Sequence, residues 1–176
     1  MNTPILKTDR LNLRPFRPED AQAVFDSWES DPVVARSMFW TSHNDIKKTK
    51  EWIAFEISQI GNPDWYRFAL ELKASGELIG TALIYYEEEL RSWEVGYNLS
   101  KAYWDCGYTT EAMGCVLAFA KEQLGVSEVA GRYAKENPAS GRVLEKLGFQ
   151  YENDIPYPCN DGNIVREGIL CRLKLR

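Results

Sequence analysis

The stretch that decides the fold runs from Trp93 to Ala112 and reads WEVGYNLSKAYWDCGYTTEA. Its first part, to Leu99, has the side-chain alternation of a β-strand, and a short polar loop then leads to Gly107, where a helix begins. The first turn of a helix leaves backbone N–H groups unpaired at the positive end of the helix dipole. A strand, a loop and a glycine before a helix can therefore form a binding site for an anion such as a phosphate.

The residues of this turn suit a phosphate. Gly107 lets a ligand approach the backbone closely, and Thr109 and Thr110 add hydroxyl donors in the first helical turn. The turn is not a P-loop, which requires Gly-Lys-Ser or Gly-Lys-Thr, and it lacks two of the three glycines of a dinucleotide-binding turn. Because one glycine before a helix usually marks a simple turn, the assignment depends on the surrounding sequence.

Hydrophobic periodicity predicts elements on both sides of this unit. The predicted strands span residues 6–14, 65–72, 78–86, 93–99, 126–133, 149–151 and 164–175. The predicted helices span 18–29, 46–60, 107–124 and 138–147, the second after a Ser42/Asp45 capping box and the last with Asn137 as N-cap. The order β-α-α-β-β-β-α-β-α-β-β predicts one α+β domain over residues 1–176, with a central mixed, mostly antiparallel sheet flanked by helices.

Composition excludes several classes of protein. A net charge of −5 argues against nucleic-acid binding, and although it suits a cationic partner such as an amine, solubility alone explains it. The four cysteines lack metal or redox spacing and there is one histidine, so we expect free thiols and no metal. The N-terminus does not read as a signal peptide and no apolar run could span a membrane, so we expect a cytoplasmic protein without membrane contact.

The stretch Glu94–Ala112 resembles the acetyl-CoA motif of the GNAT superfamily of N-acetyltransferases. Asn137–Phe149 resembles the second motif of that superfamily, and the opening Thr8–Arg14 and the order of elements fit as well. The resemblance covers nearly the whole chain and is strongest to the ribosomal-protein N-terminal (alanine/serine) acetyltransferases. It implies an acetyl-CoA-dependent enzyme in which an amine attacks the thioester directly.

The resemblance also implies where acetyl-CoA binds. In this family the strand before the motif splays from its neighbour at a bulge, pantetheine lies in the gap, and the pyrophosphate binds N–H groups at the start of the following helix. The implied cofactor-binding residues are Tyr97, Asn98, Leu99, Trp104, Cys106, Gly107, Tyr108, Thr109, Thr110, Asn137 and Arg142. Thr109 departs from the usual glycine or alanine, and its bulk either lowers affinity or adds a hydrogen bond.

Two residues are candidates for catalysis. Many members of the family place a tyrosine before Glu-Lys-Leu-Gly-Phe to protonate the departing thiolate, but this chain has Leu144 there. Ser140 lies one turn earlier on the same helix face and could reach the sulfur, or it could simply stabilise the first turn. Glu94 shares a strand face with Asn98 and is the candidate base, directly or through a water. On that hypothesis Glu94→Gln lowers turnover with little change in acetyl-CoA affinity; the alternative is a solvated strand glutamate.

The sequence leaves the acceptor open. A protein or peptide N-terminal amine fits the subgroup, and a polyamine, an amino acid or an aminoglycoside is the alternative. The missing tyrosine also suits a non-catalytic acyl-CoA-binding module. A homodimer is compatible with the sequence, but no feature demands one. His43, in a polar loop, is expected at the surface or at a helix cap.

Overall fold

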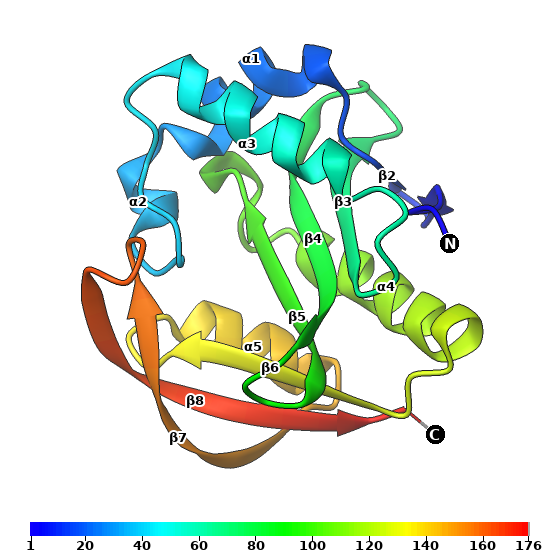
Figure 1. The fold of residues 1–176 in the computed structure, drawn as a ribbon, viewed down its shortest axis with the longest axis vertical. Coiled ribbons are helices and arrows are strands. Elements are labelled where there is room, and N and C mark those ends of the chain that lie inside the picture. Colours follow the sequence, from blue (N-terminus) through cyan, green and yellow to red (C-terminus); the bar gives the residue numbers. More distant parts are fainter. Residues whose placement is uncertain (176) are drawn as a thin grey trace.

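Eight strands form one sheet in the order β1-β2-β3-β4-β5-β6-β8-β7 in the computed structural model, which describes residues 1–175 (Figure 1). The strands are β1 (Leu6–Lys7), β2 (Leu11–Arg14), β3 (Trp65–Leu72), β4 (Leu78–Glu87), β5 (Ser92–Leu99), β6 (Glu128–Ala134), β7 (Gln150–Cys159) and β8 (Ile164–Lys174). Strands β5 and β6 pair in parallel, and the other neighbours pair antiparallel. The sheet is therefore mixed and mostly antiparallel, as predicted.

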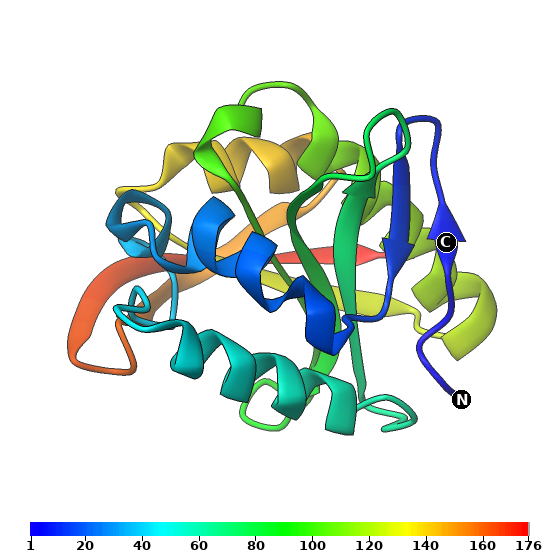
Figure 2. The same ribbon diagram turned by 90° about the horizontal axis from the view of Figure 1, so that it is seen from above.

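Helices cover both faces of this sheet, as Figure 2 shows from above. On one side lie α1 (Ala21–Val24), the π-helical turn η2 (Phe25–Glu29), α2 (Pro32–Ala35) and α3 (Ile46–Ser58). On the other side lie α4 (Tyr108–Leu124) and α5 (Pro138–Lys146). Short 3₁₀ turns, η1 (Pro18–Asp20) and η3 (Lys101–Tyr103), precede α1 and α4.

Strand alternation divides the core into two clusters. Tyr66, Phe68 and Leu70 of β3 point toward α4 and join the larger cluster with Met113 and Phe119. The smaller cluster packs the α1–α3 layer on the opposite face. Its buried members are Phe16, Ala21, Val24, Trp28, Val34, Ile53, Ala69 and Leu78. A residue of β4 or β5 can therefore be assigned to the α4 side or to the α1–α3 side from its register.

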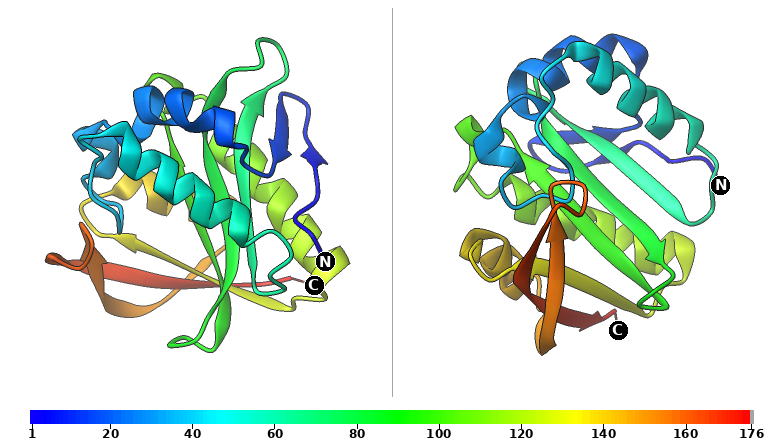
Figure 3. Two further views of the ribbon diagram at one scale, coloured as in Figure 1. Left: turned by 45° about the horizontal axis from the view of Figure 1, so that its top comes forward. Right: turned by 60° about the vertical axis from the view of Figure 1, so that its left-hand side comes forward.

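The contact between β5 and β6 is short. The two strands pair at Trp93, Glu94 and Val95, and beyond Val95 no residue of β5 is paired with β6 in the described chain. β5 nevertheless stays paired with β4 up to Leu99, without a shift in register. The sheet therefore opens between β5 and β6 on the side where α4 and α5 begin, which is visible in both views of Figure 3.

The structure differs from the predicted elements in five places. The strand predicted over 6–14 is a β1–β2 hairpin, because Thr8 and Arg10 turn away from the sheet to contact Glu111. The first helix is divided into η1, α1 and η2, and α2 was not predicted. Strand β7 reaches Cys159 instead of ending at residue 151, since an edge strand tolerates prolines at positions without ladder hydrogen bonds. Helix α3 begins after Asp45, whose own side chain caps it, and does not use a Ser42 box.

Candidate active site

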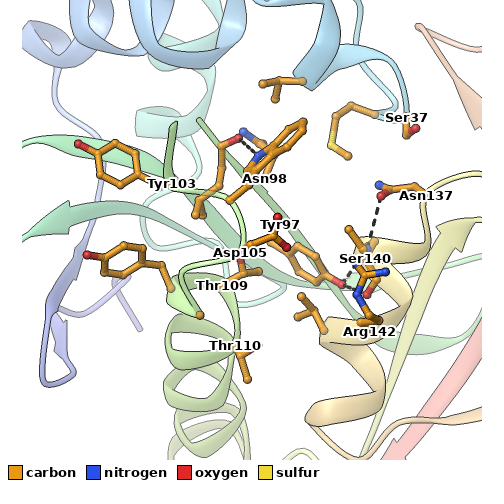
Figure 4. Close-up of a pocket in the computed structure, with 18 of the residues that line it drawn as sticks. Ser37, Tyr97, Asn98, Tyr103, Asp105, Thr109, Thr110, Asn137, Ser140 and Arg142 are labelled. Atoms are coloured by element: carbon orange, nitrogen blue, oxygen red, sulfur yellow. Dashed lines mark hydrogen bonds between the residues drawn. The ribbon is translucent and has the colours of Figure 1, made fainter. Parts of the chain in front are cut away.

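A cavity of about 440 Å³ lies where β5 leaves β6, bounded by α2, the turn before α4 and the start of α5. Eleven of the residues predicted from the sequence line it: Tyr97, Asn98, Leu99, Trp104, Gly107, Tyr108, Thr109, Thr110, Asn137, Ser140 and Arg142. Figure 4 shows most of them around one space. Glu94 and Cys106 are not among the lining residues.

One wall of the cavity was missed by the sequence analysis. It comes from α2 and the segment after it and consists of Val33, Val34, Arg36, Ser37 and Met38. Backbone hydrogen bonds hold this segment against the tip of the β7–β8 hairpin, including Asn160 N to Met38 O at 3.1 Å. The hairpin tip and the α2 segment are far apart in the sequence, and no local sequence pattern predicts their contact.

The turn before α4 has the geometry of an anion site. Gly107 is the N-cap with φ of 80°, in the left-handed region that favours glycine, and no side chain caps the helix. The first backbone hydrogen bond of the helix is Glu111 N to Gly107 O, at 3.1 Å. A Cβ on Gly107 would lie 3.6 Å from Arg10, an ordinary contact, so glycine is required here by conformation and not by space.

Hydrogen bonds from the turn between β1 and β2 hold this segment in place. Arg10 Nε donates to Glu111 Oε2 at 2.6 Å, and Arg10 Nη1 donates to the carbonyl oxygen of Cys106 at 3.1 Å. Thr8 Oγ1 donates to Glu111 Oε1 at 2.5 Å. Burial alone would raise the pKa of Glu111, but the hydrogen bonds from Thr8 and Arg10 outweigh it and hold that pKa below its ordinary value. The charged carboxylate thus fixes the first turn of α4.

On the opposite wall, Tyr97 contacts Ser140 (Figure 4). The Tyr97 hydroxyl donates to the Ser140 carbonyl oxygen at 2.9 Å and lies 3.0 Å from Ser140 Oγ. Asn137 caps α5 by accepting from Ser140 N at 3.4 Å. Burial raises the pKa of Tyr97, so this phenol stays protonated at neutral pH. The sequence indicated the backbone of Tyr97, not its side chain.

Leu144 fills the position of the absent tyrosine. Its side chain is 1% exposed and belongs to the larger core cluster. A hydroxyl in the α5 wall of the cavity therefore comes from Ser140, one turn earlier.

Glu94 is buried and fully engaged. Its carboxylate accepts two hydrogen bonds from Arg132 of β6, each 2.7 Å long, and one from the hydroxyl of Tyr85 of β4 at 2.8 Å. Burial, and then the Glu94 carboxylate, raise the pKa of Tyr85, which keeps its proton for this bond. Glu94 thus joins β4, β5 and β6, and the expected alternative of a solvated glutamate is wrong because the residue is only 4% exposed.

His43 is also buried, so the expected surface position is wrong. Its Nε2 lies 3.3 Å from Glu29 Oε2 and its Nδ1 lies 2.7 Å from Thr49 Oγ1. The backbone N–H of His43 donates to the Glu29 carbonyl oxygen at 2.6 Å. This hydrogen bond joins the two ends of the segment that contains α2. Burial lowers the pKa of His43 to about 4 and raises that of Glu29 to about 7, so both side chains are mostly neutral near pH 6.

The charge of the cavity lining is not acidic. Its cationic residues are Arg36, Arg142 and Lys146, and its carboxylates are Asp105 and Glu136. Glu136 is paired with Arg166 at 2.7 Å and with the lining residue Arg36 at 4.0 Å. Within residues 1–175, no group of three or more His, Cys, Asp or Glu side chains is placed to hold a metal, and no helix is long and apolar enough to cross a membrane.

Comparisons with known proteins agree with this geometry. A family profile described as an acetyltransferase (GNAT) domain matches residues 10–150. The uncharacterized N-acetyltransferase YoaA of Bacillus subtilis (strain 168) is 30% identical over 173 residues, which cover 93% of this chain and 97% of YoaA.

Solved structures share the fold. The ribosomal-protein-S5-alanine acetyltransferase from Vibrio fischeri matches with a TM-score of 0.81 and 17% identity, covering 97% of this chain and 96% of its own. The ribosomal L7/L12 α-N-protein acetyltransferase RimL, in complex with coenzyme A, matches with a TM-score of 0.85 and 13% identity, covering 98% of each chain.

Proposed function

Because this chain belongs to the GNAT family of acetyltransferases and transfers an acetyl group from acetyl-CoA to an amine, we propose that its acceptor is the N-terminal amine of a protein or peptide. The charge of the cavity carries this proposal. A polyamine or an aminoglycoside bears several positive charges and needs acidic walls, whereas the charged residues that line this site are three cations and two carboxylates, and Glu136 is paired with Arg36 and Arg166. An α-amine has a pKa of about 8, so it carries at most one charge near neutral pH.

The names of two structural relatives point the same way. The Vibrio fischeri enzyme and RimL are described as acting on ribosomal proteins, although at this identity the likeness itself concerns the fold.

The four cysteines of the chain are all free thiols, which suits a reducing compartment, and we place the reaction in the cytoplasm.

The cofactor follows the open edge of β5. Pantetheine would lie along Tyr97–Leu99, where β5 is no longer paired with β6, and the pyrophosphate would bind backbone N–H groups from Cys106 to Thr110. Asn137 orders the start of α5 beside the thioester, and Arg142 supplies a cation for the CoA phosphates. Thr109 and Thr110 line the same space and can donate hydroxyl hydrogen bonds.

In the reaction, the amine nitrogen attacks the thioester carbon, a C–N bond forms and the C–S bond breaks. The amine loses one proton and the departing thiolate gains one. We assign the hydrogen bond to the sulfur to Ser140 Oγ, because Ser140 lines the cavity and the Tyr97 hydroxyl holds it in place. Burial of the amine beside the thioester supplies the proximity on which direct transfer depends.

For Glu94 the contacts support a positioning role, which we propose in place of the base predicted from the sequence. Arg132 and Tyr85 occupy both carboxylate oxygens, and Glu94 does not line the cavity. As a base it would have to act through a water and give up part of this network.

The test is a panel of acceptors offered to the purified protein with acetyl-CoA. The panel contains peptides that begin with alanine or serine, the same peptides with a blocked N-terminus, spermidine, an aminoglycoside and free amino acids. Thiol release with the free-N-terminus peptides, and none with the blocked ones, supports the proposal. Thiol release with spermidine or the aminoglycoside alone contradicts it, as does CoA binding without release for any amine.

A further inference from the structure

The face of the sheet toward the α1–α3 layer carries a row of three small side chains across β3, β4 and β5. Ala69, Thr81 and Asn98 are directly opposed in register. Ala69 belongs to the core cluster of the α1–α3 layer, together with Trp28 of η2 and Val34 of α2. Thr81 and Asn98 therefore face the same layer, and Asn98 ends the row where the sheet opens into the cavity.

Two neighbouring polar atoms in this row lack partners. Asn98 is 8% exposed and Thr81 is fully buried, and neither Asn98 Nδ2 nor Thr81 Oγ1 has a hydrogen-bond partner within the described residues. Directly opposed side chains of an antiparallel pair have Cβ atoms about 4.5–5.5 Å apart. Thr81 Oγ1 is therefore the neighbouring side-chain acceptor that we assign to Asn98 Nδ2, although the two atoms are not bonded in this structure. The Asn98 carbonyl oxygen, Oδ1, is then free to accept a hydrogen bond at the cavity wall.

Asn98 is also the available polar side chain on this face of β5. Glu94 shares the face but is occupied by Arg132 and Tyr85, and Gly96 between them has no side chain. Tyr97 and Leu99 point to the opposite face and pack with the core beneath α4. A molecule that enters the cavity beside α2 therefore meets the Asn98 amide first among the side chains of β5 on that side.

We propose that Asn98 binds the acceptor, with Oδ1 accepting an N–H of the attacking amine and Thr81 holding the amide in that orientation. This inference rests on the proposed function for the position of the thioester, along the open edge of β5. A neutral amide can orient an amine but cannot take its proton. With no base assigned beside Asn98, we expect the amine to bind uncharged, so kcat/KM should rise with pH through the pKa of the acceptor, about 8 for an α-amine.

The test compares Asn98→Leu, which has the same branched shape and no acceptor oxygen, with Asn98→Asp, which keeps one. Asn12→Ala is the control, because Asn12 lies on β2 and bonds Glu71 away from the cavity. We expect Asn98→Leu to raise the acceptor KM by about 5- to 100-fold, the cost of leaving the N–H of the neutral amine without a partner in the complex. The Kd for CoA should change by less than about twofold in Asn98→Leu. The acceptor KM of Asn98→Asp should be closer to that of wild type than to that of Asn98→Leu.

A second variant tests the role of Thr81. Thr81→Val removes the hydroxyl with little change in shape, and we expect a smaller rise in acceptor KM, about three- to tenfold. The melting temperature of each variant is measured as well, so that KM and Kd values are compared only between folded proteins.

Three results would overturn the inference: an unchanged acceptor KM in Asn98→Leu, a loss of CoA affinity without an effect on the acceptor, or a wild-type kcat/KM that does not rise with pH through the pKa of the amine. If wild type acetylates spermidine and not peptides, the proposed function fails. The same Asn98 comparison with spermidine then still decides the role of this residue.

Discussion

Replacing Glu94 with glutamine should destabilise the sheet before it affects chemistry. The Glu94 and Arg132 side chains are 5% and 16% exposed, and losing one partner of a buried pair costs about 3–5 kcal/mol. Because glutamine keeps one acceptor oxygen for Tyr85 or Arg132, we expect a loss of about 2–4 kcal/mol. For a chain of this size each kcal/mol lowers the melting temperature by about 2–4 °C, so Tm should fall by about 5–15 °C.

The assay combines thermal unfolding with steady-state kinetics for Glu94→Gln, Arg132→Met and a surface control. Glu167→Gln is that control, since Glu167 is 85% exposed and lies 3.9 Å from Lys135, and its Tm should match wild type. If Glu94 is a positioning residue, both buried variants lose stability and kcat falls in both by a similar factor. An unchanged Tm with a kcat collapse confined to Glu94→Gln would refute this reasoning and make Glu94 the base.

Three further changes test other parts of the structure. Arg10→Ala should raise the Kd for CoA about 3- to 30-fold in calorimetry while the protein stays folded, because it removes the hydrogen bonds that hold the first turn of α4 in place. An unchanged Kd would show that Arg10 does not order this turn for CoA binding. Gly80→Ala should lower the free energy of unfolding by about 3 kcal/mol in urea, since its Cβ would lie 2.3 Å from a carbonyl oxygen of β5, and wild-type stability would contradict the packing. The pKa of Glu29 is raised on folding, so the free energy of unfolding increases as the pH falls from about 7 to the pKa of Glu29 in the unfolded chain. The pKa of His43 is lowered on folding, so the free energy of unfolding decreases as the pH falls from about 6.5. The two effects are of similar size and opposite sign in wild type, so relative to wild type Glu29→Gln should lose about 2 kcal/mol between pH 6.5 and pH 5. Parallel pH profiles would show that the two groups are not linked to folding in this way.

The parts of the fold that the sequence predicted are those with long, regular periodicity. Strand β3 and the unit from β5 into α4 have clear alternation and a clear glycine stop, and their bounds agree with the prediction within a residue. The α2 segment was missed because a four-residue helix is too short to show a period, and tertiary contacts hold it in place.

The site was predictable where one contiguous motif supplied it. The phosphate turn and the start of α5 are local, so their residues could be read from the chain. The partners of Glu94 could not, since Arg132 is 38 residues away and meets it through the parallel β5–β6 register. The burial of His43 likewise depends on a segment that folds back on Glu29. No sequence pattern around either residue predicts this contact.

The central claim is that the turn at Gly107 binds the CoA moiety of the donor. Calorimetry with CoA on wild type and on Gly107→Val tests it most directly, because valine strongly disfavours a φ of 80° whereas the space for a side chain is present. The account predicts one CoA per chain in wild type and affinity reduced at least about tenfold in the variant, with both proteins folded. Equal affinity in the two proteins, or no binding of CoA to wild type, would contradict it.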